Sequence, residues 1–154
     1  MANEAILNLG TELVLAATGT TSSISDGSYA ECTDDTRTSA DNPGYILGIF
    51  EFDTAAGGFS AAPTAGAVVH LYEQSINSDS NDAPDVDANF QHKYLYSIPI
   101  DPADAQQYHV TPPLPINRSG AKYWVQWVDG GAGTASVDSG WALRLTPCAY
   151  GTSA

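Results

Sequence analysis

Apolar and polar residues alternate with a period of two along most of this chain, or gather in short blocks rich in β-branched and aromatic residues. Such alternation places one set of side chains in a core and the other in solvent, which is typical of β-strands. The pattern predicts eight strands, at residues 13–18, 28–32, 45–53, 67–75, 93–100, 107–111, 122–129 and 141–146. The chain is therefore expected to be all-β.

Two of these segments predict how strands face the core. In 93–100, the set Tyr94, Tyr96, Ile98 and Ile100 falls on one face and is expected to be buried, while the alternate residues face solvent. Segment 122–129 is apolar on both faces, which fits either a central strand or a strand with an exposed binding face.

The segments between the strands are rich in Gly, Pro, Asn and Asp, and they predict turns at 41–44, 57–58, 63–66, 112–115 and 130–133. About eight short strands with these turns predict a two-sheet antiparallel β-sandwich of jelly-roll type, with a closed barrel as the alternative. The expected organisation is an N-terminal arm or edge strand at 1–12, a single sandwich domain at 13–150 and a short tail at 151–154.

The charge is strongly one-sided, because 18 Asp and Glu stand against 5 Lys and Arg, for a formal net charge of −13. Such a chain repels phosphate backbones and anionic membrane surfaces, so neither nucleic acid nor a membrane is an expected partner. Residues 1–10 lack the features of a secretory signal, which predicts synthesis in the cytoplasm. Cys32 and Cys148 match neither a zinc nor a redox spacing, and free buried thiols are favoured over a disulfide.

An acidic loop at 77–89 is the first candidate for metal chemistry. It carries Asp79, Asp82, Asp85 and Asp87, and its second half resembles the opening of a calcium-binding loop. Phe90 stands where such a loop needs Gly for its sharp turn, and no closing Glu follows. A solvated loop is favoured over a looser calcium site, and no metal or cofactor is expected.

Candidate catalytic groups occur in no recognised motif. His70, His92 and His109 stand in none. Glu51 and Asp53 share one strand face, and the end of the strand is favoured over a catalytic carboxylate pair as their explanation. The prediction is that the chain has no catalytic residues and is not an enzyme. A hydrolase of unrecognised type is the third hypothesis for its function.

The aromatic residues offer a binding alternative. Tyr123, Trp124, Trp127 and Trp141 are mostly expected in the core, since a sandwich poor in Leu and Ile needs large side chains to fill it. Trp124 and Trp141 are nevertheless kept as possible glycan or interface aromatics. The alternative function is accordingly a carbohydrate- or receptor-binding module of a virion or enzyme.

The N-terminal segment is the candidate for contact with another protein surface. Its apolar residues Ala5, Ile6, Leu7 and Leu9 are suited to adding a strand to an exposed sheet edge. An ordinary first strand of the sandwich is the equally weighted alternative.

Four segments together carry a family resemblance: GAVVHLYE at 66–73, YLYSIPI at 94–100, the PPLP turn at 112–115 and KYWVQW at 122–127. In this pattern of strands and turns, over roughly residues 13–150, the chain resembles the head decoration, or cement, proteins of tailed bacteriophages. The resemblance implies a structural protein without cofactor or reaction, bound in many copies to the major capsid protein on the outer capsid surface of the virion. It also implies a homo-oligomer, with a trimer favoured, and it makes a capsid or a neighbouring subunit the expected contact of Ala5, Ile6, Leu7 and Leu9.

Overall fold

A computed structural model describes residues 5–17, 20–32, 45–54, 58–75, 86, 93–102, 106–117, 121–131 and 135–152. Within these ranges the chain forms ten strands and no helix. The strands are β1 (Ala5–Leu9), β2 (Leu13–Ala16), β3 (Tyr29–Glu31), β4 (Leu47–Asp53), β5 (Val68–Gln74), β6 (Lys93–Pro99), β7 (Tyr108–Val110), β8 (Leu114–Pro115), β9 (Lys122–Val128) and β10 (Ala142–Thr152). No helix of the described chain is long and apolar enough to cross a membrane.

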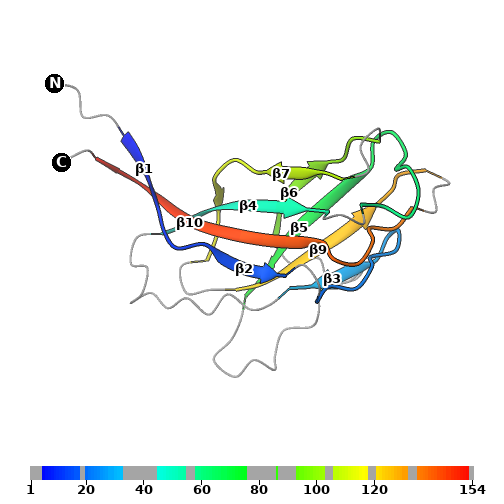
Figure 1. Ribbon diagram of the computed structural model, residues 1–154. Helices are drawn as coiled ribbons and strands as arrows, with labels where there is room; N and C mark the ends of the chain where they lie inside the picture. The colour runs from blue at the N-terminus through cyan, green and yellow to red at the C-terminus, as the bar shows by residue number, and fades with distance from the viewer. Residues whose placement is uncertain are drawn as a thin grey trace.

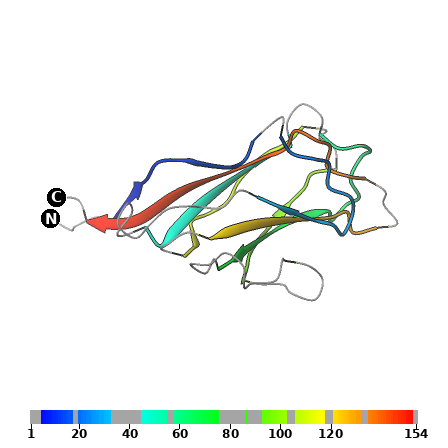
Figure 2. The same cartoon turned by 90° about the horizontal axis from the view of Figure 1, so that it is seen from below.

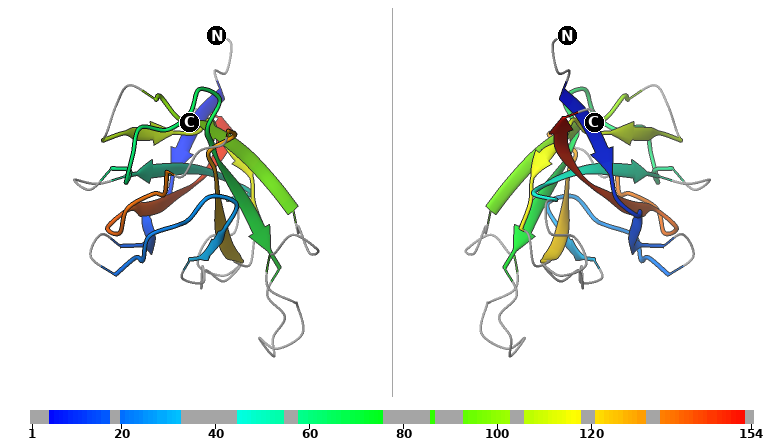
Figure 3. Two further views of the ribbon diagram at one scale, coloured as in Figure 1. Left: turned by 90° about the vertical axis from the view of Figure 1, so that its right-hand side faces the viewer. Right: turned by 90° about the vertical axis from the view of Figure 1, so that its left-hand side faces the viewer.

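The strands form two antiparallel sheets that lie over each other as separate layers (Figures 1 and 3). The six-stranded sheet has the order β1-β10-β4-β7, with β2 also paired to β10 and β8 also paired to β4. The four-stranded sheet has the order β3-β9-β5-β6. The predicted all-β, two-sheet antiparallel sandwich is confirmed and the closed barrel is excluded, whereas the jelly-roll type stays a prediction.

The core lies between the inner faces of the two sheets. Phe50, Phe52 and Leu145 project from the six-stranded sheet, and Val125 and Trp127 from the four-stranded sheet, all with none of their surface exposed. Burial of one such side chain contributes roughly 1.5–3 kcal/mol. The buried Phe50, Phe52 and Trp127 show that large aromatic residues fill much of the core, as the composition predicts.

Strand β9 lies between β3 and β5, which decides the alternative left open for segment 122–129 in favour of a central strand. Its inner residues Tyr123, Val125 and Trp127 belong to the main core. On the outer face, Trp124 belongs to a second, smaller cluster with Tyr72 and Val86. Both faces of β9 are thus covered.

A bulge in β6 overturns the predicted burial of Tyr94. Leu71 pairs with Tyr96 but Tyr72 pairs with Tyr94, so Leu95 is an extra residue in β6. An inserted residue reverses the faces of all residues beyond it. Ile98 is buried and Tyr96 packs against the core, as predicted, whereas Tyr94 emerges on the outer face with 53% of its surface exposed.

Two boundaries also differ from the prediction. Leu114 and Pro115, expected in a turn, form the edge strand β8 against β4, where a proline is tolerated because the outer side of an edge strand needs no N–H donor. Strand β10 continues past Pro147 to Thr152, so the predicted tail at 151–154 begins inside a strand. The carbonyl of Pro147 still accepts a hydrogen bond from the Gly10 N–H at 2.7 Å.

Gly48 is a position in the sandwich with no room for additional volume. It is buried in β4, and a Cβ atom there would collide with Leu145 Cδ1 and lie 3.1 Å from Ile116 Cδ1. Gly48→Ala is expected to lower the free energy of unfolding by about 1–3 kcal/mol, the usual cost of overpacking. Gly151→Ala is the control, because its Cβ would meet only the amide end of Asn8, which can turn away. Equal destabilisation of both variants in urea would show that the packing around Gly48 is no tighter than that around Gly151.

Candidate binding surfaces

Strand β1 and the end of β10 form a two-stranded ribbon that extends beyond the sandwich (Figures 1 and 2). β1 pairs with β10 from Ala5↔Thr152 to Leu9↔Cys148, whereas the pairing of β4 with β10 ends at Cys148. The predicted contact segment is therefore an edge strand paired within its own chain. On this ribbon Leu9 and Tyr150 are 58% and 64% exposed. The side chains of Ala5 and Ile6 lie outside the described part of the molecule.

The outer face of the six-stranded sheet carries most of the exposed large apolar side chains among the described residues. Leu9, Val14, Tyr108, Val110 and Tyr150 all lie on this face and are all more than half exposed. Residues that pair on neighbouring strands point to the same side of a sheet. The residues of β4 and β10 that pair with this exposed set alternate along their strands with the buried Phe50 and Phe52 of β4 and Leu143 and Leu145 of β10, so the exposed set lies on the side away from the core. We call this set, together with Leu7, the outer apolar face.

A group of charged residues lies within the outer apolar face. Arg144 Nε is 3.8 Å from Glu12 Oε1, and Arg144 is paired in register with Glu51. A hydrogen bond to Glu51 raises the pKa of Tyr108. Glu51 and Asp53 thus lie on an open sheet surface, where Glu51 accepts a hydrogen bond from Tyr108.

Neither tryptophan retained as a glycan or interface aromatic offers a free ring. Trp124 is 6% exposed, and its Nε1 donates to Gln74 Oε1 at 2.7 Å. Trp141 is 2% exposed, and its Nε1 donates to the Ser22 carbonyl at 2.8 Å. A planar ring must be accessible to stack on a sugar, so these two residues do not support the carbohydrate-binding alternative.

A cavity of about 420 Å³ opens where the β2 edge of one sheet approaches the β3 edge of the other, and its walls include Leu15, Ala16, Tyr29, Glu31 and Trp141. The hydroxyl of Thr21, another wall residue, donates to the Trp141 carbonyl at 2.8 Å and accepts from the Gly140 N–H at 3.0 Å. Glu31 forms an ion pair with Lys122 at 2.7 Å. These polar wall groups already have partners within the protein.

The outer face of the four-stranded sheet carries aromatic rings in mutual edge contact. The Tyr94 ring lies 6.0 Å from both the Tyr72 and the His70 rings, and Tyr29 lies 5.9 Å from Tyr72. Ser97 Oγ lies 2.6 Å from His70 Nδ1 and 2.7 Å from the Tyr94 hydroxyl. Burial lowers the pKa of His70. The rings and their polar groups stabilise one another, and Tyr94 is the most exposed of them.

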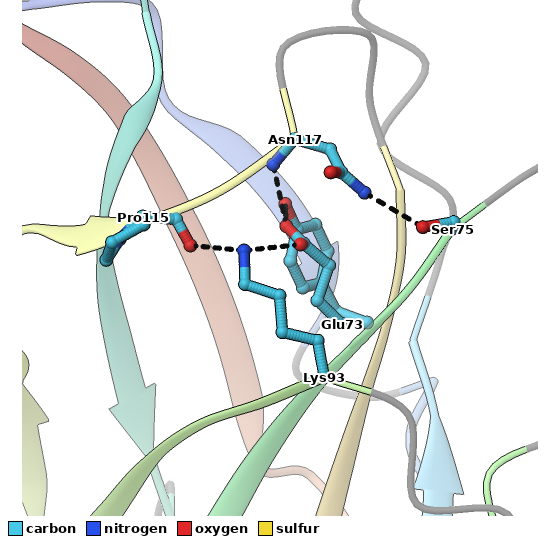
Figure 4. Close-up of polar contacts among 6 residues, drawn as sticks. Glu73, Ser75, Lys93, Pro115 and Asn117 are labelled. Atoms are coloured by element: carbon cyan, nitrogen blue, oxygen red, sulfur yellow. Dashed lines mark hydrogen bonds and ion pairs between the residues drawn. The ribbon is translucent and has the colours of Figure 1, made fainter.

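A buried carboxylate joins the two sheets at one end of the sandwich (Figure 4). Glu73 is 2% exposed; its Oε1 accepts from Lys93 Nζ at 2.9 Å and its Oε2 from the Asn117 N–H at 2.9 Å. The Tyr123 hydroxyl donates to Oε2 at 3.2 Å, and Lys93 Nζ also donates to the Pro115 carbonyl at 2.9 Å. Both carboxylate oxygens are occupied, so Glu73 has a structural role.

Removal of Lys93 tests this buried charge. Lys93→Met leaves the buried Glu73 carboxylate without a counter-ion and is expected to lower the free energy of unfolding by about 1–3 kcal/mol, because the Lys93 side chain is 47% exposed and water screens part of its charge. The double variant Glu73→Gln/Lys93→Met should be more stable than Lys93→Met alone, because a neutral amide oxygen can still accept from Asn117 and Tyr123. Chemical denaturation of the three proteins checks this, and a double variant no more stable than Lys93→Met would contradict it.

Other candidates from the sequence form no common site. His109 Nε2 lies 2.9 Å from Gln107 Oε1, and burial lowers the pKa of His109 against an opposing effect of Asp101. In the described portion of the chain, no three His, Cys, Asp or Glu residues gather as a metal site. His92, Asp79, Asp82, Asp85 and Asp87 lie outside the described residues.

The two cysteines are free and buried, as predicted. Burial raises the pKa of both thiols, so little reactive thiolate is present at neutral pH. Neither Cys32 nor Cys148 is therefore expected to react with Ellman's reagent in the folded protein at mildly alkaline pH, and both should react in denaturant. Rapid labelling of one thiol under native conditions would show that it is accessible.

Sequence reasoning missed most of the outer apolar face. The available signal was an apolar residue on the solvent side of a strand, as at Tyr108 and Val110, which flank the half-buried His109.

The chain matches no protein-family model, and comparisons with curated proteins and with solved structures found no match either.

Proposed function

We propose that this chain is a structural virion protein, a head decoration protein that binds the major capsid protein on the outside of a tailed-phage capsid and stabilises the shell. The observation that carries the proposal is the outer apolar face, on which five large side chains of a single sheet are each more than half exposed. Exposed apolar residues gathered on one face of a soluble protein are typical of an interaction surface. The family resemblance supplies the identity of the partner.

The composition of this face suits a protein partner. Aromatic and aliphatic residues form most of it, and the charged groups Glu12, Glu51 and Arg144 lie among them with opposite charges adjacent. A largely apolar surface buries favourably against protein, whereas a net charge of −13 opposes contact with nucleic acid.

Many modest contacts suffice for the proposed task. A protein that binds only the mature lattice shifts the equilibrium toward that lattice by mass action, and the contributions of many copies add over the shell. The acidic loop segments, which include 77–89, would keep decorated particles mutually repelling and soluble. No catalytic step or cofactor forms part of the proposal, and the protein would reach the virion after synthesis in the host cytoplasm.

Binding to expanded phage heads that lack this protein tests the proposal. Val14→Glu and Val110→Glu each place a charge on the outer apolar face and should weaken co-sedimentation with heads about tenfold or more, the scale of a central contact residue. Tyr94→Glu is the matched control, since Tyr94 is equally exposed but lies on the opposite sheet. Thermal unfolding should show that all three variants fold.

Two outcomes would contradict the proposal. The first is that the unaltered protein binds no head. The second is that Tyr94→Glu weakens binding as much as the two valine variants, which would move the contact away from the outer apolar face.

A further inference from the structure

The ribbon formed by β1 and residues 149–152 has two outer backbone edges. One hydrogen bond shows which residues of the ribbon direct their N–H and C=O groups toward these outer edges. Gly10 N–H donates to the Pro147 carbonyl at 2.7 Å, continuing the register that pairs Leu9 with Cys148. In an antiparallel pair, the N–H and C=O of one residue point to the same side, and successive residues alternate. Hence the backbone of Asn8 faces β10, whereas that of Leu7 faces away from it.

The same rule applies to β10. Pro147 faces β1, so Ala149 also faces β1, and the backbone of Tyr150 points to the opposite side. Strand β4 occupies that side only as far as Leu47, opposite Cys148. In the described structure, no strand pairs with the outer edge of β1 or with this edge of β10 beyond Cys148.

Neither edge carries the features that usually protect a strand from pairing. Residues 5–9 and 148–152 contain no charged residue and no proline, and Leu9 and Tyr150 are exposed. A two-stranded ribbon is marginally stable in water, and additional strands stabilise it. The ribbon is therefore suited to accept a further strand on each side.

We propose that the ribbon joins copies of this chain edge to edge, with β1 of one copy pairing with the free edge of β10 in the next copy. β1 and β10 are antiparallel within one ribbon. When two ribbons lie side by side with their tips in the same direction, β10 of one copy is therefore also antiparallel to β1 of the next copy. Each copy offers two different edges, so the contact is heterologous; such a contact forms a ring when the rotation between neighbouring copies closes and a filament when it does not. Leu7, Leu9 and Tyr150 then lie side by side on one face of the joined strands, and that face stays open.

The charge distribution favours this place of contact over the rest of the surface. Lys93, Lys122 and Arg144 each have a carboxylate partner, so these cations are not free to offset the negative charge of a neighbouring copy. Two copies of net charge −13 repel elsewhere, and the uncharged ribbon is where their backbones can approach. Salt screens the repulsion, so association should strengthen as the salt concentration rises.

Two proline variants test the edges separately. Leu7→Pro removes an N–H that points away from β10, and Tyr150→Pro removes one that points away from β1, so the bonds within the ribbon remain. The full-length protein should sediment as an oligomer and each variant as a monomer. An equimolar mixture of the two variants should form a dimer, because the intact β1 edge of one can pair with the intact β10 edge of the other.

Leu7→Val and Tyr150→Val are the controls, since both keep the N–H group and should remain oligomeric. The proposal is overturned if the unaltered protein is monomeric at high salt and high concentration, or if the proline variants remain oligomeric. It is equally overturned if Tyr150→Pro alone still forms dimers and the mixture forms no additional heterodimer, because copies would then join through two β1 edges. The experiment uses no capsid, so its failure leaves the proposed function standing.

Discussion

Backbone pairing along β10 is the constraint on which the six-stranded sheet depends. The strand bonds to β4 on one side and to β2 and then β1 on the other, so one segment determines the positions of three others. Its residues Leu143 and Leu145 project into the core, while Arg144 and Tyr150 project to the outer face. The same strand therefore holds the sandwich together and carries the ribbon beyond it.

The strand content of this fold follows directly from the period-two pattern, but the faces of individual residues do not. In β6 the extra residue Leu95 reverses the side on which Tyr94 emerges. In β2, Leu15 is extra between Val14 and Ala16, and both it and Leu13 contact the core. Bulges arise from the pairing of two strands, so the sequence of one strand alone does not reveal them.

The length of β10 was also beyond sequence reasoning, because Pro147 normally marks the end of a central strand. Pro147 lies between the part of β10 that pairs with β2 and the part that pairs with β1, so its missing N–H leaves no strand partner without a donor. Its carbonyl accepts a hydrogen bond from the Gly10 N–H. For the candidate sites, buried thiols and core aromatics were predictable from residue type. The outer apolar face was not, because the side of each residue depends on the register between strands that are distant in sequence.

The ribbon has a practical consequence for labelling and display. β1 begins opposite the end of β10, at Ala5 and Thr152, so both ends of the described chain lie at one point, the tip of the ribbon. A fluorescent protein or affinity tag fused to either end would be anchored at the tip of the ribbon and would crowd any chain lying beside it. A reporter inserted in the long connection between β5 and β6 would instead be attached to the four-stranded sheet, in the opposite layer from the ribbon.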